Sequence, residues 1–219
     1  MNYLLLLFSF IATNTCQPTM NTSTAAQNEI VEAVQNNEID LVKEFLKNGA
    51  DVNATNKSDQ SLLLIATLAN NIPMAELLVA NNANVNQQDN RKESPFLYAG
   101  AAGHLELVKL YLKNGARFDV FNRYYGSALI PACERGHIEV VRLLANTPKY
   151  PIDHVNRLGW TALMEAVMLG DGSEKFKEIV QILIDAGCDI NIPDNDKVTA
   201  LQHAKKRGFV EIARILEQG

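Results

Sequence analysis

Histidine, cysteine and carboxylate side chains are the residues of this sequence that could do catalytic or metal chemistry, and their spacing supports neither. His104 and His137 lie in matching Gly-His segments and are expected to be turn residues, and neither His154 nor His203 has a cysteine or carboxylate at the spacing of a metal site or a catalytic triad. No HExxH, GxSxG or GxxxxGKS/T motif occurs. We therefore expect no enzyme activity, no metal and no cofactor. The histidines are His104, His137, His154 and His203.

Three sets of residues recur along the chain with the same spacing. This spacing predicts the structural elements that position the other side chains. Gly49-Ala50-Asp51-Val52-Asn53 returns as Asn82-Ala83-Asn84-Val85-Asn86, a period of 33 residues. A Gly-His turn occurs at Gly103 and again at Gly136, and a related turn at Gly208. A Ser or Thr followed five residues later by alanine keeps the same phase. A shared period of this length indicates a repeat array. The Ser and Thr positions are Ser61, Ser94, Ser127, Thr161 and Thr199.

These markers resemble the ankyrin repeat, and the resemblance covers about residues 27 to 219 as six repeats whose first and last are caps. It implies an all-α solenoid of helix-turn-helix repeats with hairpin tips over residues 28–219. Two insertions interrupt the period, at 147–151 and 171–175. The histidine of the family's Thr-Pro-Leu-His motif is missing, so we expect its hydrogen bond to the preceding Ser or Thr to be absent. The replacements are Leu64, Leu97, Ile130, Met164 and Gln202.

Local chemistry explains the markers. A Ser or Thr before a helix accepts hydrogen bonds from its first amides, so we expect Ser94, Ser127, Thr161 and Thr199 to start the inner helices. The turn glycines supply positive φ where those helices end. Leu163 is predicted to lie in the core.

The cysteines are not expected to form a disulfide. There is no CxxC pair, and the repeat register places Cys133 and Cys188 at different positions of adjacent units. We therefore expect two buried thiols. Pairing in an oxidising compartment would require the two to lie close in space.

A partner-binding surface follows from the resemblance, because ankyrin-type arrays bind proteins on the concave face formed by the tips and the inner helices. Arginine and aromatic side chains, which dominate binding hot spots, gather on that face. We expect Tyr124 and Arg157, from adjacent tips, to lie side by side with Phe121 and Trp160. The alternative is that Phe121 and Trp160 pack between hairpins. The predicted partner-binding residues are Arg91, Phe121, Arg123, Tyr124, Arg157 and Trp160.

Charge excludes one class of partner. The chain has 20 basic and 25 acidic side chains, a net charge of -5, whereas binding nucleic acid by bulk charge needs a basic surplus. The run Lys205-Lys206-Arg207 is interpreted as a solvated helix end, with lipid head groups or an acidic partner as the alternative. We expect a monomer.

The N-terminus predicts export. Residues 1–16 hold a short apolar run and end at Cys16, like a bacterial lipoprotein signal whose cysteine is lipidated. Two features depart from that signal, because no Lys or Arg precedes the run and Thr13-Asn14-Thr15 is not a usual lipobox. Residues 17–27 are predicted to be a flexible tether, and ordinary cleavage within it is the alternative. The expected location is the periplasm, or a membrane reached through lipid on Cys16.

Together these observations predict a non-enzymatic module that binds one protein partner and touches membrane only through a lipid anchor. The alternative is a periplasmic accessory or immunity protein that protects or occludes an enzyme or toxin. Both would use the same face.

Overall fold

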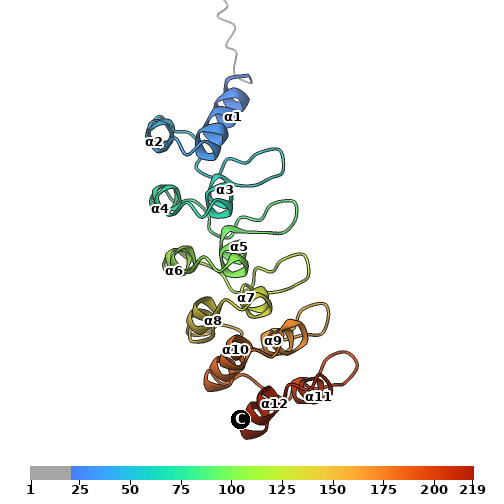
Figure 1. Ribbon diagram of the computed structural model, residues 1–219. Helices are drawn as coiled ribbons and strands as arrows, with labels where there is room; N and C mark the ends of the chain where they lie inside the picture. Colours follow the sequence, from blue (N-terminus) through green and yellow to red (C-terminus); the bar gives the residue numbers. More distant parts are fainter. Residues whose placement is uncertain (1–20) are drawn as a thin grey trace, which may run out of the picture.

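The chain folds into two columns of short helices that run side by side along the molecule (Figure 1). The computed structural model describes residues 21–219, with side chains from residue 27. The inner column lies beside the hairpin tips and consists of α1 (Asn21–Gln35), α3 (Leu62–Leu68), α5 (Pro95–Ala102), α7 (Leu129–Arg135), α9 (Ala162–Leu169) and α11 (Ala200–Lys206). The outer column consists of α2 (Ile39–Lys47), α4 (Ile72–Ala80), α6 (Leu105–Lys113), α8 (Ile138–Ala145), α10 (Glu174–Asp185) and α12 (Val210–Gln218). The predicted all-α array of six helix pairs is confirmed.

Hydroxyl caps start most inner helices. Ser94, Thr161 and Thr199 each accept a hydrogen bond from the backbone N–H three residues later, as predicted, and Ser61 does the same. These caps satisfy amide groups that would otherwise lack a partner at the start of a helix.

The prediction that Ser127 caps α7 is wrong. The residue before this helix is Ala128, and no side chain at that position bonds the first turn. Instead, the Tyr150 hydroxyl accepts a hydrogen bond of 3.1 Å from the Leu129 N–H. Burial raises the pKa of Tyr150 to about 12, so its hydroxyl stays protonated at neutral pH. Tyr150 belongs to the insertion at 147–151, so the first turn of α7 is bonded by a side chain of the insertion and not by a Ser or Thr beside the helix.

The missing motif histidine has a substitute in the last repeat. The Gln202 side chain accepts a hydrogen bond of 2.9 Å from the Thr199 N–H, while Thr199 caps Gln202 in return. The expected loss of this hydrogen bond is therefore wrong for that repeat. At the other four positions the replacement is apolar and buried in the core.

Close helix approach explains the small residues of the inner column. The alanine of each marker is buried at Ala66, Ala99, Ala132, Ala166 and Ala204. A Cβ atom on Gly100 would lie 2.7 Å from the Cβ of Ala128, so only glycine fits where α5 passes this segment. Gly103, Gly136 and Gly208 all have positive φ, as predicted.

Both cysteines of the described part are free. Cys133 is fully buried in the core, whereas Cys188 is only partly buried. The absence of a disulfide between them agrees with the expectation, and the burial agrees for Cys133 alone.

The N-terminal predictions fall mostly beyond the described residues. The signal segment 1–16 and Cys16 lie outside them. α1 begins at Asn21, so residues 21–27 of the predicted tether are helical. Within residues 21–219, no helix has the length and apolar content needed to cross a membrane.

Candidate functional site

The five hairpin tips share one construction. At the start of each tip, an Asn or Asp accepts hydrogen bonds through Oδ1 from the backbone N–H groups two and four residues later. The residue three positions on has positive φ, and in four of the five tips it is not glycine. This closed loop fixes the backbone, so the side chains of the tips project at defined positions. The five residues are Asn56, Asp89, Asn122, Asn156 and Asp194.

These five residues occupy one position of the repeat. Each lies five positions before the Ser or Thr marker, for example Asn122 before Ser127 and Asn156 before Thr161. The signal was hidden because asparagine and aspartate alternate at the position, and both supply the required Oδ1 acceptor.

A groove of about 290 Å³ lies between the second and third tips and the inner helices. Because both charge signs line it, we call it the mixed groove. Three of the predicted binding residues, Arg91, Arg123 and Tyr124, line it. Burial, together with the charge of Asp89, raises the pKa of the Glu93 carboxyl, and the nearby arginines oppose that shift. Its other charged lining residues are Asp89, Glu134 and Arg135.

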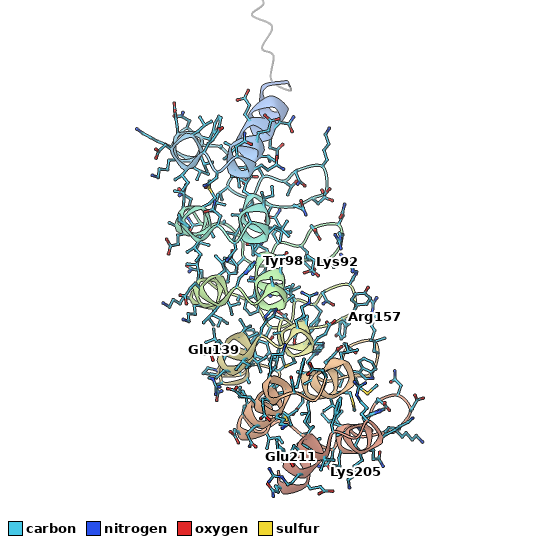
Figure 2. All side chains as sticks on the ribbon, viewed as in Figure 1. Lys92, Tyr98, Glu139, Arg157, Lys205 and Glu211 are labelled. Carbon is cyan, nitrogen blue, oxygen red and sulfur yellow. The ribbon has the colours of Figure 1, made fainter. Side chains whose placement is uncertain are left out.

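Arg123, Tyr124 and Arg157 form one exposed cluster, which we call the tip patch. The Arg157 N–H donates to the Tyr124 carbonyl, and its Nη1 donates to the Arg123 carbonyl, both at 2.9 Å. The Arg123 guanidinium lies 4.8 Å from the centre of the Tyr124 ring. Tyr124 is 54% exposed. Figure 2 places Arg157 on the tip side of the molecule and Glu139 on the opposite, outer-helix side. The proximity expected for Tyr124 and Arg157 is therefore present.

Phe121 and Trp160 make contacts of another kind. The Phe121 ring stacks on the His154 ring of the next tip, with centroids 4.1 Å apart and planes at 3°, and it also contacts Tyr125. Trp160 is half-buried against the core. Neither residue lines the mixed groove. The stacking of Phe121 on His154 is a contact between adjacent hairpins, as the packing alternative describes for Phe121.

A second groove, of about 270 Å³, lies between the third and fourth tips, over α7 and α9. Its only charged lining residues are Glu134 and Glu165, so we call it the acidic groove. Its walls are largely apolar, and Leu158 and Leu169 are about half exposed at its edge. The remaining lining residues are Asn122, Tyr124, Gly126, Ile130, Pro131 and Asn156.

Glu165 is an unusual residue on the floor of the acidic groove. It is only 4% exposed, and its Oε1 accepts a hydrogen bond of 2.8 Å from Asn156 Nδ2. Its Oε2 is buried without a partner among the described residues. Burial, followed by the charge of Glu134, raises the pKa of Glu165 to about 7, against the effect of the Asn156 hydrogen bond. Sequence analysis did not identify this residue.

The histidines serve local structure. His104 and His137 precede the outer helices α6 and α8, and burial lowers the pKa of both. His203 is paired with a carboxylate, because its Nε2 lies 2.7 Å from Asp194 Oδ2. The last tip folds back onto α11 and brings together two residues nine positions apart. No group of three or more metal-ligating side chains gathers in the described part of the chain.

Comparison with known proteins agrees with this architecture. The family model for ankyrin repeats in three copies matches residues 30–122 and 96–194, which is most of the helical array. The chain belongs to the ankyrin repeat family. The recurring Ser or Thr caps, turn glycines and Asx-based tips are therefore features of its ankyrin repeats.

Solved structures extend the match over nearly the whole array. An ankyrin repeat domain from Acinetobacter baumannii AYE is 43% identical, with a TM-score of 0.84, and the match covers 87% of this chain and 96% of that domain. A second ankyrin repeat protein of known structure is 38% identical, also with a TM-score of 0.84, over 86% of this chain and 96% of that one.

A curated relative matches a shorter stretch. The ankyrin repeat protein YahD of Escherichia coli K12 is 42% identical over 74 residues, which are 34% of this chain and 36% of that protein. The chain thus spans about a third of the length of this relative.

Proposed function

We propose that this protein is an exported, non-enzymatic binding module that holds one protein partner on the face formed by its hairpin tips and inner helices. The ankyrin repeat fold supports a protein–protein interaction module. The observation that carries the proposal is the tip patch, an exposed tyrosine between two arginines on a fixed backbone. Such side chains bind strongly because they bury a large area and donate several hydrogen bonds.

The two grooves also favour partner binding on this face. The mixed groove and the acidic groove share Tyr124, so a partner seated on this ring can reach both. The grooves differ in charge, which would select for a segment with a matching pattern of charged side chains.

Partner capture tests the proposal. The domain from residue 21 onward is used to capture proteins from the native envelope, and the captured protein is then purified for affinity measurements. A captured toxin or hydrolase that loses activity in the complex would favour an immunity or protective role. A captured protein whose affinity does not change when the tip patch is altered would contradict binding through this face.

Tyr124 and Trp160 are expected to respond differently to truncation. Tyr124→Ala should weaken partner binding by about 2 kcal/mol or more, as for a hot-spot residue, and change the free energy of unfolding by less than about 0.5 kcal/mol. Trp160→Ala should lower the free energy of unfolding by about 1–3 kcal/mol, because its ring is half-buried against the core. Affinity and melting temperature are measured on both variants. A Trp160→Ala protein that is fully stable but no longer binds would place Trp160 in the binding surface instead.

We also propose that Cys16 carries a lipid and holds the domain at a membrane. The support is the short apolar run within residues 1–16 and the cysteine that ends this segment. Cys16→Ser should move the protein from the membrane fraction to the soluble fraction, because stable attachment needs the acyl chains that this thiol would receive. Fractionation followed by immunoblotting gives the measurement, with Cys188→Ser as the control. Unchanged fractionation would indicate cleavage without lipid, or no processing.

A further inference from the structure

The acidic groove carries a more specific inference, which rests on the proposed function. The inference concerns the chemistry of the partner side chain that enters it. Three features of the groove matter: an incompletely bonded carboxylate on the floor, the absence of a lining cation, and apolar walls.

The carboxylate of Glu165 has one oxygen bonded and one free of partners among the described residues. Asn156 does not supply the second bond: its Nδ2 donates to Oε1 alone, and its Oδ1, which can only accept, is already bonded to the Leu158 and Trp160 N–H groups. A buried carboxylate oxygen without a donor is unfavourable, so a donor that reaches this oxygen gains a hydrogen bond there.

Three arginines and a histidine of the surrounding elements are bonded elsewhere, while the Arg123 guanidinium lies against the Tyr124 ring. On α7, Arg135 donates to the Ala101 carbonyl; at the fourth tip, Arg157 donates to the Arg123 carbonyl. Beyond α9, Arg207 donates to the carbonyls of Met168 and Gly170. On α11, His203 is bonded to Asp194.

The other charged residue of the lining is Glu134. Its charge also raises the pKa of Glu165, but less than burial does. A visiting positive charge would therefore be attracted to both carboxylates. No residue that lines the groove carries a positive charge.

The walls select the shape of the visitor. Ile130, Pro131, Leu158 and Leu169 offer apolar surface along the groove, and the Tyr124 ring lies at its border. An arginine can lay its methylene stem on such a surface while its guanidinium reaches the acids. The guanidinium is planar, carries five donors and is more weakly hydrated than the lysine ammonium.

We propose that the acidic groove receives an arginine side chain of the protein partner, whose guanidinium donates to Glu165 Oε2. The contact completes the bonding of a carboxylate that the fold leaves half satisfied. It also explains why a charged residue occupies a buried position on α9, where the equivalent residue of α7 is Pro131.

Selection from a library of random dodecapeptides tests the proposal without a known partner. The library is displayed on phage and selected on the folded domain, and binders are synthesised with their arginine, with citrulline, or with lysine. Citrulline keeps the shape but lacks the charge. The selected peptides should share one arginine, and citrulline should lower the affinity at least about tenfold.

Protein variants assign the effect to Glu165. In Glu165→Gln, which preserves the side-chain shape, the difference between arginine and citrulline peptides should disappear. The matched control is Glu139→Gln, the same change on the opposite face of the molecule (Figure 2), and it should keep the full difference. A melting curve of each variant verifies that it is folded.

The affinity should also depend on pH. An arginine favours the ionised carboxylate, so binding should tighten as the pH rises through the Glu165 pKa of about 7. The titratable groups coupled to Glu165 are Glu134 and Cys133, both from α7. Because these groups remain in Glu165→Gln, the part of the pH dependence that the variant loses belongs to Glu165.

Several outcomes would overturn the inference. One is a set of selected peptides that share no arginine. Another is an arginine peptide that binds no more tightly than its citrulline or lysine version. The third is a difference in affinity between arginine and citrulline peptides that is still present in Glu165→Gln. If such peptides still lose affinity in Tyr124→Ala, the proposed binding face stands and only the arginine subsite fails. If they bind regardless of Tyr124, the proposed face fails as well.

Discussion

Removal of residues 194–219 is expected to lower the melting temperature by roughly 10 °C or more and to cause aggregation. This last repeat covers the end of the array, because α11 packs against α9 and α12 packs against α10. Its buried residues Ala204, Ile212 and Leu216 face the preceding repeat instead of solvent. In a repeat array each unit buries its apolar surface only against its neighbours, so the deletion exposes one whole interface. A loss of several kcal/mol corresponds to this shift at about 2–4 °C per kcal/mol.

The deletion also removes a polar contact. Arg207 donates to the Met168 and Gly170 carbonyls at the end of α9, at 2.8 and 3.0 Å. Calorimetry and size-exclusion chromatography measure stability and association. The control is Val210→Ser, which changes an apolar side chain that α12 exposes to solvent and should leave both unchanged. A shortened chain that stays monomeric and as heat-stable as the parent would refute the capping role of the last repeat.

Leu163→Ala is expected to lower the free energy of unfolding by about 2–5 kcal/mol, the usual loss for a buried leucine. Leu163 is 3% exposed and lies on α9, between α7 and α11. The rigid packing of neighbouring inner helices limits how far they can close the cavity that the substitution leaves.

A matched leucine five residues earlier is the control. Leu158 is 52% exposed, so Leu158→Ala removes the same atoms from a solvated position and should cost less than about 0.5 kcal/mol. Urea denaturation of both variants gives the comparison. Similar losses in the two variants would mean that Leu163 does not lie in the core.

Structural features that lie within one repeat can be predicted from the sequence. The caps at Ser94, Thr161 and Thr199, the positive φ of the turn glycines and the burial of Leu163 all follow from residues a few positions apart. Helix capping and backbone φ are local properties, so the residue types at fixed spacing are sufficient to predict them. The period of 33 then implies the stacking of such units.

Contacts that cross from one segment to another required the three-dimensional arrangement. Tyr150 caps α7 in place of Ser127, and the tips fold back to join Asn156 to Glu165 and Asp194 to His203. These pairs depend on how far each tip leans over its inner helix and how closely neighbouring repeats approach. The repeat pattern specifies neither, because hydrogen bonding between two side chains needs their atoms to lie within about 3 Å. The acidic groove, which is enclosed by two tips and two helices, arises from that geometry and has no motif of its own.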